Sequence, residues 1–182
     1  MKNSKSLIAA FVFATASLGS SAVMAADISS GPETLSIPDE SAFFGSTFAA
    51  NNANDTFADQ FNFTIGAVPS SVDAIVSSIS RSAVTGLNIS NLQLFSSNGN
   101  LITTGMASET GATDVWTVSS GVLSSGNYYL QVSGSLVSNT SGSFGGSVQL
   151  NPVPEPETYG MMIAGLGVLG FLARRRKAAN QA

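Results

Sequence analysis

The chain has 182 residues, enough for one modest domain, and contains neither cysteine nor histidine. These absences exclude disulfides, thiolate nucleophiles, a Ser-His-Asp triad and zinc or iron sites that use His or Cys ligands. Between residues 26 and 153 Arg81 is the only basic residue and the net charge is −8. A body this acidic has no surface for nucleic acid and is repelled by anionic membranes, so we expect no nucleic-acid partner. We expect no cofactor either.

Residues 1–25 are predicted to be a secretory signal peptide. Lys2 and Lys5 form a positive start, residues 7–18 are apolar, and Val23-Met24-Ala25 suits a cleavage site. We expect export through the Sec translocon and cleavage by signal peptidase between Ala25 and Ala26. The alternative is an amino-terminal membrane anchor that is retained, but the apolar stretch is short for that role.

Residues 26–54 read as a partly irregular leader, broken at Gly31-Pro32 and Ile37-Pro38, with a loose strand or two. A β-domain is expected over 55–151, and its clearest strand covers 57–65, where apolar residues occupy the odd positions. Asp59 shares that apolar face, so its carboxylate must be hydrogen-bonded or lie near the rim. The alternative is one ligand of a calcium ion, although no Asp-x-Asp-x-Asp-Gly loop supports it.

Further strands are predicted along the rest of the body. Val72 to Ile79 fits either a helical stripe or a strand, and its β-branched residues favour the strand. Asn98-Gly99 between two apolar runs indicates a hairpin. The remaining predicted strands cover 87–95, 101–104, 115–118, 128–134 and 144–150. Short strands with Gly/Ser/Asn turns predict an antiparallel β-sandwich. The Tyr128-Tyr129 strand resembles a late strand of secreted jelly-roll-like bacterial domains such as the pre-peptidase C-terminal domain, which implies a jelly-roll-like sandwich.

Candidate glycan contacts in this body are Trp116, Tyr128 and Tyr129. At least one of the two tyrosines must point outward from a regular strand. The alternative is that the aromatic residues belong to the core or to a sheet edge. Two pairs of carboxylates could in principle hydrolyse glycosides without histidine, namely Asp55 with Asp59 and Glu109 with Asp114. Nothing in the sequence indicates their geometry, and we expect a protein that is not an enzyme.

Residues 152–182 contain three units in a fixed order. The Pro-rich segment 152–158 should be extended, because each proline fixes φ and removes a donor. The apolar run 159–173 is shorter than the ~20 residues of a full span, but snorkelling arginines could compensate, so we predict a short transmembrane helix. A basic tail follows over 174–182, expected in the cytoplasm by the positive-inside rule. The alternative is a buried helix of a soluble domain with a charged end.

The motif Pro154-Glu155-Pro156, the Gly-rich apolar run and the cluster Arg174-Arg175-Arg176-Lys177 closely resemble the PEP-CTERM sorting domain of Gram-negative bacteria. The resemblance covers 152–177 and implies cleavage by exosortase, a membrane-embedded, cysteine transpeptidase-like enzyme of species that make exopolysaccharide. The same tail is also named an ice-binding protein C-terminal domain, which is no reason to expect ice binding. The segment around Phe57, Asp59 and Phe61 resembles the motif of the FxDxF family of PEP-CTERM proteins.

These features together predict a non-enzymatic surface or extracellular-matrix protein. It would be exported, held at the inner membrane, cut by exosortase near Pro154-Glu155-Pro156 and released to the cell surface or to an exopolysaccharide or biofilm matrix. The alternative function is a carbohydrate-binding module on the same sorting signal.

Overall fold

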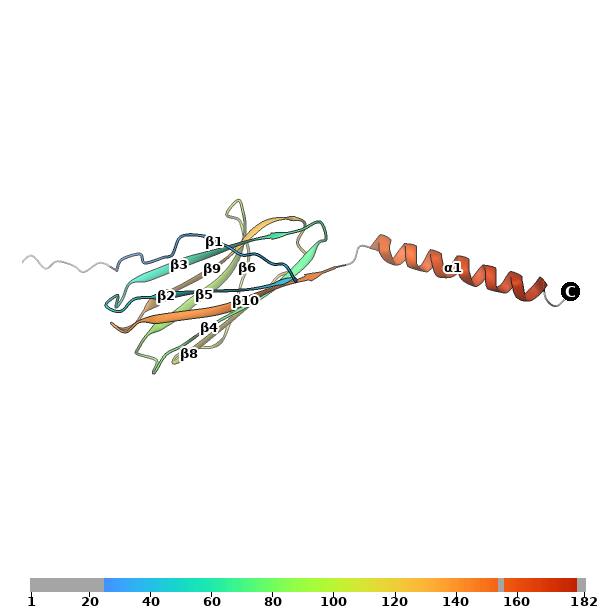
Figure 1. Ribbon diagram of the computed structural model, residues 1–182. Helices are drawn as coiled ribbons and strands as arrows, with labels where there is room; N and C mark the ends of the chain where they lie inside the picture. Colours follow the sequence, from blue (N-terminus) through green and yellow to red (C-terminus); the bar gives the residue numbers. More distant parts are fainter. Residues whose placement is uncertain (1–24, 154–155, 180–182) are drawn as a thin grey trace, which may run out of the picture.

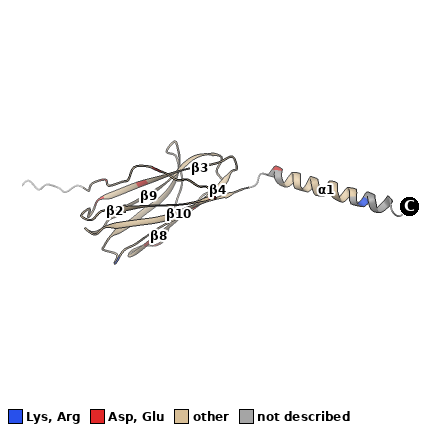
Figure 2. Cartoon of the chain, in the orientation of Figure 1, with Lys and Arg blue, Asp and Glu red and all other residues tan. Residues whose placement is uncertain are grey.

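The computed structural model describes residues 25–153 and 156–179. Apart from Ala25, the predicted signal peptide lies outside the described residues. Two sheets stack face to face, and a helix, α1, follows the last strand (Figure 1). Charged residues are sparse along the strands (Figure 2), as the composition of the body requires.

Each sheet of the sandwich has five strands. The first sheet has the order β1 (Glu33–Thr34), β3 (Thr56–Ile65), β9 (Gly126–Leu136), β5 (Leu87–Ser96) and β6 (Leu101–Thr104). The second has the order β2 (Ser41–Phe48), β10 (Gly142–Pro152), β4 (Ser70–Ile79), β8 (Thr113–Ser119) and β7 (Met106–Glu109). The short β1 pairs in parallel with β3, and the other pairs are antiparallel. The chain crosses repeatedly from one sheet to the other.

The core lies between the sheets and is rich in phenylalanine. Phe48 packs on Phe57 with ring centroids 4.6 Å apart, and Phe44 packs on Phe61 at 4.7 Å. Burying each such side chain stabilises the fold by about 1.5–3 kcal/mol. Alternate residues of a strand face opposite sides, which is why the odd positions of β3 supply its buried face.

Two phenylalanine rings of the core lie over glycines of the neighbouring strand. Phe57 pairs with Gly134, and Phe44 pairs with Gly146. A Cβ atom on Gly134 would stand 2.6 Å from the Phe57 ring, and one on Gly146 would stand 2.6 Å from the Phe44 ring. Glycine is therefore required at both positions, because any side chain would displace the ring that covers it.

The structure confirms the predicted all-β sandwich and most of its strands. Val72 to Ile79 is a strand, not a helix, and β5 and β6 form the predicted hairpin around Asn98-Gly99. The segment 26–54 contains β1 and β2, and β2 pairs with β10 along its whole length. β2 is thus a full strand of the second sheet, although Gly45-Ser46-Thr47 interrupts its apolar pattern.

The apolar run after the sandwich forms α1 (Pro156–Ala179). Among the residues that the structure describes, no helix combines the length and the apolar character needed to cross a membrane. This corrects the prediction of a transmembrane helix over 159–173. The run has only fifteen residues, lies between Glu157 and Arg174, and includes four glycines that add no apolar side chain.

Candidate functional site

The predicted sorting region begins where the sandwich ends. Val153 donates its N–H to the carbonyl of Pro69 at 2.8 Å and so fastens the end of β10. Pro154 and Glu155 lie outside the described residues, and Pro156 opens α1, a position that suits proline because its missing N–H would have no partner there. All strands that the structure describes precede this point. A cut at the motif would therefore separate the sandwich from α1 without removing a strand.

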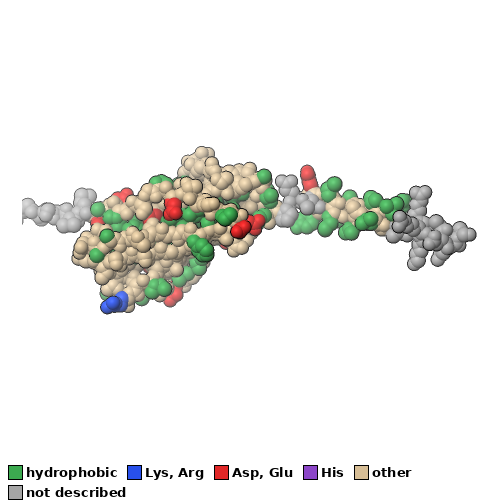
Figure 3. Space-filling model, viewed as in Figure 1, with side chains coloured by type: hydrophobic (Ala, Val, Ile, Leu, Met, Phe, Trp, Pro, Cys, Tyr) green, Lys and Arg blue, Asp and Glu red, His purple; other side chains and the backbone are tan. Residues whose placement is uncertain are grey.

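The described side chains of helix α1 bury no surface against the sandwich. Every α1 side chain that the structure describes is exposed, including Ile163, Leu166 and Phe171. Figure 3 shows hydrophobic side chains along this helix. Glu157 lies in the first turn, where the helix dipole favours a negative charge, and Arg174 lies near the other end, where it favours a positive one. Of the predicted basic cluster, Arg175, Arg176 and Lys177 lie on α1, with side chains outside the described part.

Two of the three aromatic candidates are built into the sandwich. Trp116 packs partly buried against the core and donates its Nε1–H to the carbonyl of Ile89 at 3.1 Å. Tyr128 also packs against the core, stacks on Phe63 with centroids 6.1 Å apart, and donates its hydroxyl to the carbonyl of Ser124 at 2.9 Å. Both side chains already have partners within the fold.

Tyr129 takes the opposite direction and lies half-buried on the outer face of the first sheet. Phe95 of β5 is its register partner, and the two rings stack with centroids 5.0 Å apart and an interplanar angle of 11°. Phe95 was not singled out from the sequence, because its neighbour on the next strand is known only once the strand pairing is known.

A row of glutamines runs beside this aromatic pair. Gln131 of β9 is the register partner of Gln60 on β3 and also of Gln93 on β5. Gln93 donates to Thr104 Oγ1 at 3.4 Å, which continues the row onto β6. The parallel row holds Asn62, Tyr129 and Phe95. We call this half-buried surface the amide face, and define it by Gln60, Asn62, Gln93, Phe95, Tyr129 and Gln131.

Asp59, the central residue of the motif Phe57-x-Asp59-x-Phe61, is buried between the sheets with only 1% of its surface exposed. Its Oδ1 accepts the N–H of Ser30 at 2.6 Å, which is the hydrogen bond that its position on an apolar face requires. Its Oδ2 has no partner. Next to it, Ser29 Oγ accepts the N–H of Ala58 at 2.8 Å. The carboxylate therefore ties the leader to β3, and Phe57 and Phe61 pack in the core on the same face.

Of the other three predicted carboxylates, Asp55 and Asp114 also serve the fold. Asp55 Oδ1 accepts the N–H of Ala26 at 2.7 Å. Asp114 is buried and accepts three hydrogen bonds, whereas Glu109 is exposed. Within the described residues no group of three or more acidic side chains is placed to hold a metal ion.

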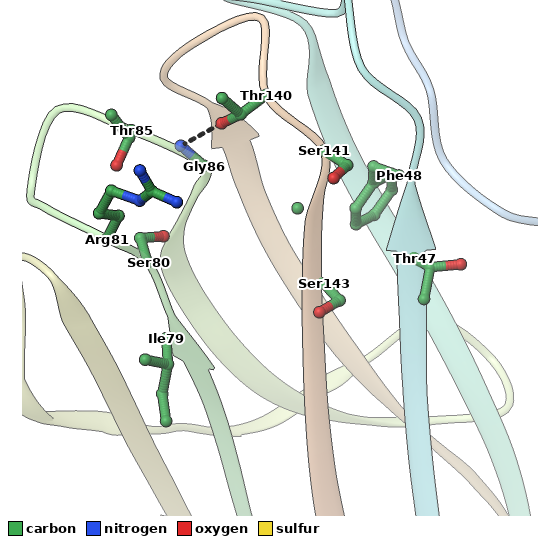
Figure 4. A pocket seen from close by; sticks show the side chains of 11 residues that line it. Thr47, Phe48, Ile79, Ser80, Arg81, Thr85, Gly86, Thr140, Ser141 and Ser143 are labelled. Carbon is green, nitrogen blue, oxygen red and sulfur yellow. Dashed lines mark hydrogen bonds between the residues drawn. The ribbon is translucent and has the colours of Figure 1, made fainter.

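A cavity of about 610 Å³ opens at one end of the sandwich (Figure 4). It contains Arg81 and is walled by hydroxyl groups of Ser80, Thr85, Thr140, Ser141 and Ser143. Several of these groups already have partners: Gly86 donates its N–H to Thr140 Oγ1 at 3.0 Å, and Ser82 donates to Thr85 Oγ1 at 3.0 Å. Arg81 supplies the positive charge of this cavity.

Comparisons with known proteins identify one segment. Residues 152–177 match the PEP-CTERM protein-sorting motif. No curated protein matches the chain. Among solved structures, the pre-peptidase C-terminal domain of a collagenase from Bacillus anthracis is similar, with a TM-score of 0.39 and 16% identity, over 69% of this chain and 95% of that one. The chain therefore carries, at residues 152–177, a PEP-CTERM protein-sorting motif, which implies an exported, membrane-anchored precursor of a Gram-negative bacterium and exosortase as its processing enzyme.

Proposed function

We propose that this protein is a non-enzymatic β-sandwich delivered to the cell surface or extracellular matrix by its PEP-CTERM motif. The observation that carries the proposal is the position of the motif: residues 152–177 start at the last residue of β10, where the sandwich is complete. Exosortase would cut near Pro154-Glu155-Pro156 and release a whole domain.

The order of steps follows from the two ends of the domain. Signal peptidase cuts between Ala25 and Ala26 after export through the Sec translocon, and the precursor stays at the inner membrane, as its PEP-CTERM motif implies, until the second cut. The exposed apolar side chains of α1 favour such an anchored state, because they are otherwise left in water. After the second cut, an acidic domain leaves an anionic membrane surface easily and can join an exopolysaccharide or biofilm matrix.

Intact mass spectrometry of the native protein tests this sequence of cuts. In a host with exosortase we expect the mass of a product that starts at Ala26 and ends between residues 153 and 157, plus the mass of any added group. Replacement of Pro154-Glu155-Pro156 by three alanines should give the longer product that is also found without exosortase. The control is Pro32→Ala, an exposed proline of the leader. If the wild-type product still extends to Ala182 in a host with working exosortase, the proposal is contradicted.

A carbohydrate-binding module is the second candidate function. The stacked pair of Tyr129 and Phe95 favours it, because aromatic rings on an open sheet face can pack against sugar rings. We expect Tyr129→Ala to reduce retention on glycan affinity gels. Phe43→Ala is the matched control, since Phe43 is 87% exposed on the outer face of the second sheet. Equal retention of wild type and Tyr129→Ala would remove Tyr129 from the candidates.

A further inference from the structure

We propose that the amide face binds an extended, neutral polysaccharide that lies across β3, β9 and β5. The inference rests on the carbohydrate-binding function above and specifies its site and ligand class. It is carried by the strand register, which places three glutamines side by side and an aromatic pair in the next row.

The glutamine row suits a chain of sugar hydroxyls. Neighbouring strands lie ~4.8 Å apart, so the amides of Gln60, Gln131 and Gln93 recur at about that interval across the sheet. Each amide offers two donors and an acceptor with two lone pairs. Of the three, Gln93 has a weak protein partner, Thr104 at 3.4 Å. A ligand that lies along this row therefore meets a repeated set of groups that can both donate and accept.

The aromatic row supplies the apolar side of the site. Tyr129 and Phe95 stand two residues along their strands from Gln131 and Gln93, a displacement of ~7 Å. Their rings are stacked on each other and half-exposed, so together they form one ledge beside the amides. Sugar rings combine hydroxyl edges with C–H faces, and this surface presents a partner for each.

The lack of charge selects a neutral ligand. None of the six residues of the amide face is ionisable at neutral pH, and the ends of the two rows, Thr104, Leu101 and Thr34, are uncharged as well. An acidic polysaccharide would need a cation to compensate its carboxylates. The basic residue of the body, Arg81, lies in the separate cavity of Figure 4. Because the amide face is open along its rows, an internal stretch of a polysaccharide can lie on it.

Affinity gel electrophoresis of the whole chain, with soluble polysaccharides as probes, tests the site. The neutral probes are hydroxyethyl cellulose, laminarin and galactomannan, and the acidic probe is alginate. We expect retardation by at least one neutral probe and none by alginate. Gln131→Ala should weaken the affinity about three- to tenfold, as expected when the hydrogen bonds of one amide are lost. Gln149→Ala, an exposed glutamine of the second sheet, should change nothing.

The outcomes separate this inference from the functions on which it rests. Binding that is lost in Tyr129→Ala but kept in both Gln131→Ala and the double variant Gln60→Ala/Gln93→Ala overturns the amide row and leaves carbohydrate binding in place. Alginate binding that Arg81→Ala abolishes moves the site to the cavity and overturns the inference. No retardation by any probe overturns both. A dimer that is seen by analytical sedimentation and that dissociates in Gln131→Ala would mean that a second copy of the chain, and not a polysaccharide, covers the amide face. Circular dichroism confirms that each variant is folded.

Discussion

Two carboxylates are buried inside the sandwich, Asp59 on β3 and Asp114 on β8, and each is 1% exposed. Asp114 accepts the N–H of Ile89 at 2.9 Å, the N–H of Gly111 at 3.0 Å and the hydroxyl of Ser78 at 3.2 Å. Asp59 accepts one hydrogen bond, from Ser30, and its second oxygen has no partner. The same chemical group is thus fully satisfied at one site and half satisfied at the other.

The difference teaches what each carboxylate does for the fold. The register of β5 is irregular between Ile89 and Asn91. Side chains of the other sheet hydrogen-bond both backbone polar groups of Ile89: Asp114 accepts its N–H, and Trp116 donates to its carbonyl. Asp114 is therefore a cross-link between the sheets. Asp59 instead holds the exposed part of the leader around Ser30 against β3.

The largest expected effect is the loss of the Asp114 cross-link. Asp114→Ala leaves two backbone N–H groups and a serine hydroxyl without their acceptor, and we expect the free energy of unfolding to fall by about 3–5 kcal/mol. Urea denaturation, monitored by the fluorescence of Trp116, measures this free energy. Glu109→Ala, at an exposed acid of the same hairpin, is the control and should stay within about 0.5 kcal/mol. A change below 1 kcal/mol in Asp114→Ala would refute the cross-link.

Replacement of each carboxylate by its amide sharpens the comparison. Asp59→Asn keeps an oxygen for Ser30 and removes a buried charge that lacks a second partner, so the free energy of unfolding should change by less than about 1 kcal/mol. Asp114→Asn places an NH₂ group against donors and should cost about 1–3 kcal/mol. Parallel urea titrations of the two variants measure the difference. Equal losses would show that the hydrogen-bond count does not decide the cost.

The same two residues show how far the sequence could lead. The regular alternation of 57–65 predicted β3 and made Asp59 stand out on an apolar face. Asp114 gave no such signal, because its donors come from a turn, from β4 and from β5, which only the strand pairing and the packing of the two sheets bring near. The amide face was hidden for a related reason: alternation assigns Gln60, Gln93 and Gln131 to outer faces, but their alignment depends on register. The sorting motif, in contrast, is contiguous and could be predicted in full.

A smaller effect is expected where the leader begins. After cleavage at Ala25, the α-amino group of Ala26 would occupy the position of the N–H that lies 2.7 Å from Asp55 Oδ1, and it would carry a positive charge. A chain that starts at Ala26 should therefore be more stable than one acetylated there, by up to about 1 kcal/mol at low salt. Asp55→Asn should abolish the difference, and high salt should reduce it. Calorimetry of the four proteins measures this; a difference that persists in Asp55→Asn would contradict the pairing.

The smallest expected effect concerns Asp27, an exposed carboxylate one residue further on. Hydrogen bonds from the hydroxyl and then the N–H of Ser29 hold the pKa of Asp27 below its ordinary value of 3.8. Because the folded state binds the proton less tightly, the contribution to stability is complete above pH 3.8 and is lost as the pH falls through the folded-state pKa. NMR titration of the carboxyl carbon measures this shift. Ser29→Ala should bring the pKa back toward 3.8, since it removes the larger of the two causes, and an unchanged pKa in that variant would assign the shift to another group.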